Sequence, residues 1–410
     1  MQGLTRRKWI GLAAVTPTLS LGGTDRSASP SMEQLKQVAE QPVLQFQGLD
    51  RPVVIHSIRL LRKGREHFVH VRSTDGAEGL CVTNERARYL YPILKTLVIP
   101  YFIGKDVRDL EGHLWELYRY QSNYKLQGLA FWCPQAWVEL AILDMFGRIL
   151  NKPMAELVGG IRRRWIPFYV ASERRDTTPE EEVEYLQQLL QETGARAVKF
   201  RVGGRMSRNQ DAMPGRTEKL ISLARKVLGD QIDLHADANS SYDPPEAIRV
   251  GRMLEDVGAV FFEEPCPFDH LEDTRLVTEA LEIPVAGGEQ EYSEWRFRWS
   301  IHRRVVDIVQ PDIQYYGGLI RSLRVARMAD LAGMPAAPHI SGGFGFVYML
   351  IFASCAPRLA RYQEYKKGVE RYGEWFDPPL TVRDGALSVP TGPGVGIKDI
   401  HAVISGAEEV

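Results

Sequence analysis

Short apolar runs alternate with amphipathic segments over the second half of the chain. Thr178 and Pro179 have the signature of a helix N-cap and first turn, and Gly194 follows the last periodic residue of that segment. Similar signals predict further helices near residues 216–228, 244–257, 270–281, 293–302, 318–331 and 345–355. The apolar runs predict strands at 167–171, 198–202, 232–236, 259–263, 284–287, 307–310, 335–338 and 361–364.

Regular alternation of strands and helices indicates an α/β fold, a (β/α)7β TIM-like barrel. The competing architecture is a doubly wound open sheet, which normally carries a glycine-rich nucleotide loop after an early strand. Gly342, Gly343 and Gly345 fit neither the dinucleotide nor the phosphate-loop spacing. The pattern therefore favours the barrel.

The first half of the chain has a different texture. Residues 24–48 are polar and predict a linker, whereas 53–62 and 67–72 alternate like paired strands. A helix with one strongly apolar face is expected over 135–148. We therefore expect an α+β domain before the barrel.

The N-terminus resembles an export signal. Arg6 and Arg7 precede a weakly apolar run, residues 9–21, that is interrupted by Pro17 and is short for a membrane span. We expect export through the twin-arginine pathway to the periplasm or medium, with residues 1–30 as signal and linker. A basic tail without a targeting role is the alternative.

Composition excludes several classes of partner. The formal net charge is −1 and 25% of residues are charged, so there is no electrostatic reason to expect nucleic acid or an anionic membrane. The cysteines are widely spaced and form no C-x-x-C motif, which argues against zinc or redox sites. We expect them to be small buried hydrophobes, although export leaves a disulfide open; they are Cys81, Cys133, Cys266 and Cys355.

Ionisable residues follow the predicted strands one after another. Barrel enzymes place their active sites at the C-terminal ends of the strands, so these side chains are expected to converge. A lone carboxylate there is usually a helix cap or an ion-pair partner, but three on consecutive strands stay ionised together only beside a cation. Oxygen ligands alone favour Mg²⁺. The ionisable residues that follow the predicted strands are Lys199, Arg201, Asp237, Glu263, Glu289, Asp312, His339 and Glu364.

Strand alternation allows only one of Glu263 and Glu264 to face the barrel mouth. We take Glu263 as the metal ligand and expect Glu264 to pair with a neighbouring base. His235 precedes Asp237 on the same face, where a supporting role and a core role are equally plausible.

These motifs together resemble the mandelate racemase/muconate lactonizing enzyme group of the enolase superfamily, and its acid-sugar dehydratases in particular. The resemblance covers about residues 52–400 and rests on Lys199-Phe200-Arg201, Asp237-Ala238-Asn239, Glu263-Glu264-Pro265, Gly288-Glu289, the Asp312/His339 pair, and the stretches 141–147 and 157–160. It implies a capping domain (50–160 with 370–405) over a catalytic barrel (161–369), and a homo-oligomer. It also implies Mg²⁺-dependent removal of the proton α to a carboxylate.

The resemblance assigns a role to each matching residue. Asp237, Glu263 and Glu289 would bind Mg²⁺, and His339, oriented by Asp312, would be an acid/base. Lys199 would neutralise the substrate carboxylate. Asn239 would contact a substrate hydroxyl or carboxylate, and Glu364 would hydrogen-bond the substrate as an acid.

Arg201 departs from the racemase pattern, where a second lysine is the base on one face of the substrate. A guanidinium stays protonated and is a poor base, so elimination is favoured over racemisation. We expect dehydration of a sugar acid to a 2-keto-3-deoxy acid. A racemase or epimerase is the alternative, Arg201 could merely pair with Glu264 or Asp237, and an inactive exported sugar-acid-binding barrel is the alternative of another class.

Overall fold

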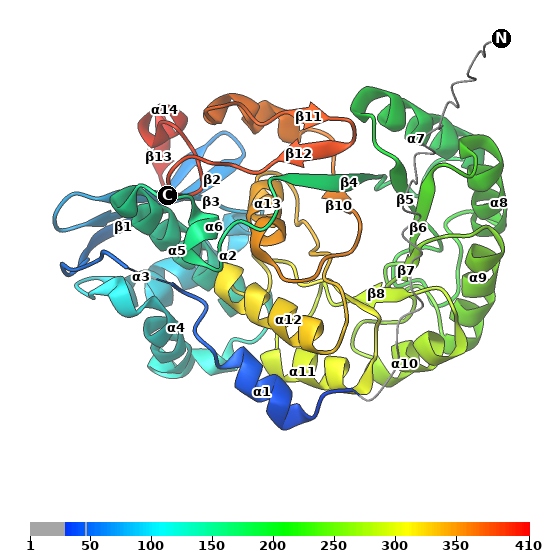
Figure 1. Cartoon of the computed structure of the whole chain (residues 1–410), viewed down its shortest axis with the longest axis horizontal. Helices are drawn as coiled ribbons and strands as arrows, with labels where there is room; N and C mark the ends of the chain where they lie inside the picture. Colours follow the sequence, from blue (N-terminus) through cyan, green and yellow to red (C-terminus); the bar gives the residue numbers. More distant parts are fainter. Residues whose placement is uncertain (1–28, 46) are drawn as a thin grey trace, which may run out of the picture.

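In a computed structural model the chain is described over residues 29–45 and 47–410, and it forms a capping unit beside a larger α/β unit (Figure 1). Helix α1 (Met32–Ala39) lies against α11 (Glu294–Arg303) and α12 (Leu319–Leu331) of the larger unit. Its Leu35 and Ala39 are buried there. The predicted linker is therefore wrong over this helix, because two apolar side chains one helical turn apart give it a face to bury.

The capping unit contains a four-stranded antiparallel sheet in the order β13-β1-β2-β3. Strands β1 (Ile55–Lys63) and β2 (Glu66–Ser73) form the hairpin that the alternation predicts. C-terminal strand β13 pairs with β1, so the last strand of the chain completes a sheet formed by its first three strands. The other elements are β3 (Glu78–Val82), α2 (Ala87–Ile93), η1 (Leu94–Val98), α3 (Ile99–Phe102), η2 (Val107–Asp109), α4 (Leu110–Arg119), η3 (Tyr120–Lys125), α5 (Leu129–Leu150), α6 (Met154–Leu157), α14 (Ile400–Ile404) and β13 (Glu408–Glu409).

Helix α5 is the core of the capping unit and starts six residues before the predicted 135–148. Among the described residues it is the one helix long and apolar enough to cross a membrane, but its most apolar window is almost wholly buried inside the molecule. Strand β3 packs closely on it, since a Cβ at Gly79 would overlap Ala141 and Met145. The apolar length of α5 is thus explained by burial on all sides.

The larger unit has parallel strands β4 (Trp165–Ala171) to β9 paired in chain order, and β10 (Gln363–Tyr365) pairs with β4. Helix α7 (Pro179–Thr193) begins at a capping box between Thr178 and Glu181. The remaining elements are β5 (Ala197–Arg201), α8 (Arg216–Leu228), β6 (Asp233–Asp237), α9 (Pro244–Asp256), β7 (Phe261–Glu263), α10 (Leu271–Ala280), β8 (Val285–Gly287), α11 (Glu294–Arg303), β9 (Ile308–Val309), α12 (Leu319–Leu331), α13 (Gly345–Cys355), η4 (Val369–Trp375), β11 (Val382–Arg383) and β12 (Ala386–Ser388).

The ladder of strands does not close between β9 and β10. The predicted strand at 335–338 is reduced to single bridges, in which Ala336 pairs with Val309 on one side and Leu359 on the other. Pro335 and Pro338 flank it, and a proline has no N–H to extend a ladder. The seventh strand is therefore a correction to the sequence-based expectation, although its backbone still lies between its neighbours.

Three hydrogen bonds hold the capping sheet on the larger unit beside the strand ends. The Asn84 N–H, just after β3, donates to Gln314 Oε1 (2.7 Å), and the Val82 N–H donates to the Tyr348 hydroxyl (3.0 Å). Asn84 Nδ2 also donates to Ser341 Oγ (3.4 Å), two residues after His339. The cap thus reaches the segment that carries a predicted active-site residue.

Candidate active site

Lys199, Arg201, Asp237 and Glu263 lie on three adjacent strands, as predicted. Arg201 is in register with Asp237 across β5 and β6, and Asp237 is in register with Glu263 across β6 and β7. All four side chains are buried. Parallel pairing in register therefore brings two cations and two carboxylates to one edge of the sheet.

Lys199 is the cation at the centre of this group. Its Nζ lies 2.8 Å from Glu263 Oε2, 3.0 Å from Glu364 Oε1 and 3.8 Å from Asp237 Oδ2. Burial lowers the pKa of Lys199, but Glu263 and Glu364 outweigh it and leave the pKa raised. The ammonium stays protonated and can neutralise a carboxylate brought beside it.

Arg201 is a fixed cation. It forms an ion pair with Asp237, and its Nε donates to the Ser172 carbonyl (3.0 Å). Its Nη1 also lies 3.3 Å from Asn239 Oδ1. Of the two partners considered from the sequence, the structure selects Asp237. A guanidinium held in this way supplies positive charge and no base.

Glu264 departs from its predicted role. It forms no ion pair within the described residues; its Oε2 accepts from Asn239 Nδ2 (3.5 Å), and its Oε1 has no hydrogen-bond partner. Its φ of +42° ends the strand alternation, so Glu264 lies near Glu263 and Glu289 rather than on the opposite face. Burial, then the charges of Glu289 and Glu263, raises the pKa of Glu264 well above its ordinary value.

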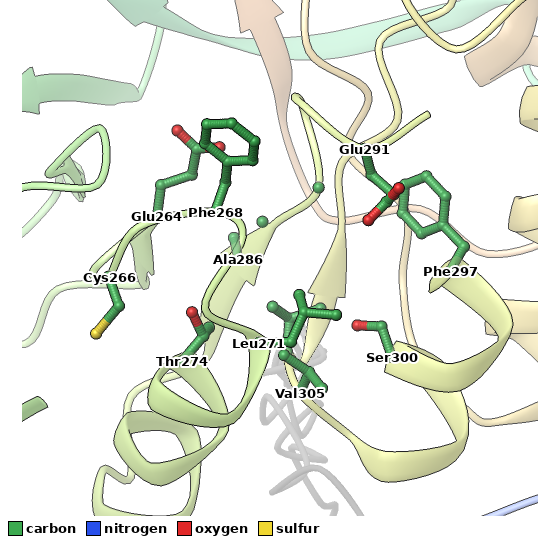
Figure 2. A pocket seen from close by; sticks show the side chains of 13 residues that line it. Glu264, Cys266, Phe268, Leu271, Thr274, Ala286, Glu291, Phe297, Ser300 and Val305 are labelled. Atoms are coloured by element: carbon green, nitrogen blue, oxygen red, sulfur yellow. The ribbon is translucent and has the colours of Figure 1, made fainter. Parts of the chain in front are cut away.

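A small cavity of about 40 Å³ lies beside strand β8, between α10 and α11 (Figure 2). Glu264 and Glu291 lie on its two sides, and Thr274 and Ser300 lie deeper between the helices. The cavity is too small for a sugar acid. Because Glu264 lines this cavity, it lies between the buried carboxylates of the site and helices α10 and α11.

His339 and Asp312 form the predicted pair. His339 Nδ1 lies 2.8 Å from Asp312 Oδ2, and its Nε2 lies 3.4 Å from Glu289 Oε2. Because a carboxylate only accepts, Nδ1 carries a proton and Nε2 points at the site. Burial lowers the pKa of His339, but Glu289 and the Asp312 hydrogen bond outweigh it, so the pKa is raised overall. Asp312 itself is fixed by the N–H groups of Gln314 and Tyr315.

Glu364 lies beside Lys199, but its surroundings favour the ionised carboxylate and not the protonated acid. Its Oε2 accepts from the Ile340 N–H (3.0 Å), and Lys199 and Lys366 lie within ion-pair distance. Burial raises its pKa, but these cations outweigh it and hold the pKa well below the ordinary value. An ionised carboxylate cannot donate a proton, so this arrangement is at odds with the acid role expected from the sequence.

The carboxylates fit a divalent cation in chemistry. Among the described residues no group of three or more His, Cys, Asp or Glu side chains is already arranged to hold an ion, since Lys199 and Arg201 occupy the carboxylates. Glu263 Oε1 is nonetheless buried with no hydrogen-bond partner in the described part of the chain, and the candidate metal ligands are all oxygens. Asp237, Glu263 and Glu289 would hold Mg²⁺, which supplies positive charge to the substrate carboxylate when bound.

The set of site residues predicted from the sequence omitted two arginines. Arg175 follows β4 and Arg205 follows β5, and both donate to Asn239 Oδ1, at 2.6 and 3.3 Å. Their position after barrel strands was the available signal, but neither stands at a strand end itself. His235 has the core role: it stacks on Phe261, and burial lowers its pKa to about 3.

Other predictions have mixed outcomes. All four cysteines are buried and free, as expected of small hydrophobes. Apart from these predictions, Tyr101 is buried in the core, and Tyr118 and Trp132 line a separate surface pocket of about 420 Å³ between the cap and α11–α12. The twin-arginine segment lies outside the described residues.

Known proteins share both units of this chain. Residues 46–159 match the N-terminal domain of mandelate racemase/muconate lactonizing enzyme, and residues 181–399 match the enolase C-terminal domain-like family. Arabinonate dehydratase of Saccharolobus solfataricus is 29% identical over 74% of this chain and 78% of its own. L-talarate/galactarate dehydratase of Salmonella typhimurium is 27% identical over 80% of this chain and 79% of its own.

Solved structures of known proteins are also similar to this chain over most of its length. A protein of Roseobacter denitrificans is 35% identical, with a TM-score of 0.80 over 87% of this chain and 99% of its own. A mandelate racemase/muconate lactonizing protein of Paracoccus denitrificans, complexed with magnesium, is 25% identical, with a TM-score of 0.79 over the same shares. The chain therefore belongs to the mandelate racemase/muconate lactonizing enzyme family of the enolase superfamily, and its dehydratase relatives make it an enzyme of the lyase class.

Proposed function

We propose that the protein is a Mg²⁺-dependent dehydratase that converts a sugar acid into its 2-keto-3-deoxy acid. The observation that carries the proposal is the asymmetry of the site. His339 Nε2 is a base oriented by Asp312, whereas Arg201 is a cation paired with Asp237. Several relatives are named as dehydratases of sugar acids, which supports the substrate class.

In the proposed reaction His339 Nε2 takes the proton from the carbon α to the carboxylate. The electrons of the broken C–H bond form a C2=C3 double bond, and the C3–O bond breaks. The imidazolium of His339 protonates the leaving hydroxyl, since Glu364 is held ionised by Lys199. The enol left behind tautomerises to the 2-keto acid, so one water is lost.

The chain's cations would stabilise the charge that grows on the substrate carboxylate as the proton leaves. Lys199 is buried and protonated, and Arg201 is fixed by Ser172 and Asp237. Such preorganised charges act strongly where water is excluded. Racemisation needs a base on each face of the substrate, and Arg201 does not supply one. The isomerase alternative is therefore disfavoured.

The test is a screen of sugar acids in D₂O with Mg²⁺, read by keto-acid formation and by proton NMR. We expect a 2-keto-3-deoxy product from at least one acid, and its loss in His339→Asn. His270→Asn, which alters an exposed histidine before α10, should keep the activity. Return of substrate with inverted configuration and no keto acid would contradict the proposal in favour of an epimerase.

We also propose that the protein is exported through the twin-arginine pathway. Arg6, Arg7 and the apolar run after them support this proposal. Fractionation of cells that express the full chain should place it outside the cytoplasm. The double variant Arg6→Lys/Arg7→Lys should remain inside; equal distribution of the two chains would contradict export by this route.

A further inference from the structure

Three guanidinium groups converge on one neutral oxygen at the edge of the candidate active site. Asn239 Oδ1 lies 2.6 Å from Arg175 Nη2, 3.3 Å from Arg201 Nη1 and 3.3 Å from Arg205 Nη2. An amide oxygen has two lone pairs and no charge, so it does not compensate these cations. The arrangement leaves unused donors and excess positive charge at this point.

Among the residues that the structure describes, only one of the three arginines has an acidic partner. Arg201 pairs with Asp237, whereas neither Arg175 nor Arg205 forms an ion pair within the described part of the chain. Arg175 Nε is buried and has no hydrogen-bond partner in residues 29–45 and 47–410. Burial and the neighbouring arginines lower the pKa of Arg175 to about 9. By contrast, Arg249 on the surface contacts the carboxylates of both Glu218 and Glu246.

The cluster is held in place by its surroundings. Buried Arg216 donates to the Thr177 carbonyl (2.8 Å) and to the Arg201 carbonyl (2.9 Å), which ties the segment after β4 to the end of β5. The Met206 N–H donates to the Asn239 carbonyl (3.0 Å), which fixes the loop that carries Arg205. A prearranged cluster loses little entropy when an anion binds.

Asn239 lies between two of these arginines, Arg175 and Arg205, and the carboxylates of Asp237 and Glu264. Its Nδ2 faces Asp237 Oδ2 (3.3 Å) and Glu264 Oε2 (3.5 Å), and its Oδ1 faces the arginines. A substrate whose reacting carboxylate lies on the Asp237 side can therefore extend its other end toward Arg175 and Arg205. Arg175 is partly exposed and Arg205 is exposed, so solvent reaches both guanidinium-bearing side chains.

We propose that Arg175 and Arg205 form a subsite for a second anionic group of the substrate, at the end remote from the reacting carboxylate. The proposal rests on the proposed function and narrows its substrate to a sugar acid with two anionic ends. Guanidinium pairs bind carboxylates and phosphates through paired N–H donors. The terminal group is a carboxylate or a phosphate, which share this chemistry.

The experiment compares acids that differ at one end only. D-gluconate, D-glucarate and 6-phospho-D-gluconate share their configuration, as do D-galactonate and galactarate. Calorimetry with the Mg²⁺-loaded protein measures binding of each, and steady-state kinetics measure KM and kcat where turnover occurs. The variants are Arg175→Gln, Arg205→Gln and Arg175→Lys, with Arg249→Gln as the control, each checked for folding by circular dichroism.

We expect a doubly anionic acid to bind about 10- to 100-fold more tightly than its singly anionic counterpart in at least one set. Arg175→Gln and Arg205→Gln should reduce that ratio by raising the KM for the doubly anionic acid. Arg175→Lys should restore part of it, and Arg249→Gln should leave it unchanged. Preference for glucarate or galactarate assigns a carboxylate, and preference for 6-phosphogluconate assigns a phosphate.

Equal binding of singly and doubly anionic acids in every set would overturn the subsite, as would equal losses for both kinds of acid in the arginine variants. Failure of the proposed function would give a different result from failure of the subsite. Turnover of a singly anionic acid without preference would leave the dehydratase and remove the subsite. Arginine-dependent preference in binding, with no turnover of any acid, would leave the subsite and remove the dehydratase.

Discussion

Lys199 Nζ donates to Glu263 Oε2 at 2.8 Å, so the lysine holds the carboxylate that the metal is expected to bind. Both side chains are buried, and no hydrogen-bond partner of Glu263 Oε1 lies within the residues that the structure describes. A buried carboxylate with one free oxygen is poised to accept a second cation, because isolated negative charge is costly in a dry site. The relation between these two residues leads directly to the metal prediction.

Mg²⁺ should raise the melting temperature of the protein, and EDTA should reverse the rise. A ligand at 100 times its Kd stabilises the folded state by about 2.7 kcal/mol. Glu263→Gln should lose this response, measured by differential scanning fluorimetry, whereas the neighbouring Glu264→Gln should retain it. Loss of the response in Glu264→Gln alone would show that the wrong glutamate has been assigned.

His339→Asn should reduce deuterium exchange at the carbon α to the carboxylate by about 10²- to 10⁴-fold, the usual contribution of a general base. Asp312→Asn should reduce it less, by about 10- to 100-fold, because it removes the partner that orients the imidazole and not the base itself. Exchange is followed by proton NMR in D₂O. A larger loss in Asp312→Asn than in His339→Asn would contradict these roles.

Arg201→Lys should open the second face of the substrate to proton transfer. A lysine amine can lose its proton, whereas a guanidinium cannot at ordinary pH. We expect recovered substrate to contain a small deuterated fraction with inverted configuration, detected by NMR. Arg201→Gln carries no base and is the matched control. Inversion by the unaltered enzyme would contradict the one-base site.

Glu139 gives a prediction for stability against pH. It is buried in α5, its Oε1 accepts from the Ile320 N–H (3.0 Å), and its Oε2 has no hydrogen-bond partner among the described residues. Burial raises its pKa from 4.5 to about 8. The folded state therefore keeps a proton that the unfolded state loses above pH 4.5, so this group lowers stability as pH rises from 4.5 to 8.

Glu139→Gln removes that titration and keeps an oxygen acceptor. The difference in melting temperature between the variant and the unaltered protein should be smallest near pH 4.5 and grow in favour of glutamine up to about pH 8. Each unit of pKa difference corresponds to about 1.4 kcal/mol. A difference that is constant with pH would contradict the protonated state of Glu139.

Local sequence patterns predicted most elements of the fold. The capping box of α7 and the period-2 alternation of β1 and β2 depend on neighbouring residues, and both appear where expected. The prolines at 335 and 338 show the limit of this reasoning, because the apolar run was read as a strand and their missing N–H groups prevented the ladder. Short-range chemistry was sufficient wherever one element formed on its own.

The candidate site likewise has some features that the sequence predicted and others that only the tertiary structure decided. Sequence alone determined the family, and placed Lys199, Asp237, Glu263 and His339 together, because residues at the ends of parallel strands share one edge. Only the tertiary structure decided that Glu264 turns toward Glu289, and that Arg175 meets Asn239 from 64 residues away. Those contacts depend on loop conformation and on packing between distant segments, which no local pattern of residues specifies.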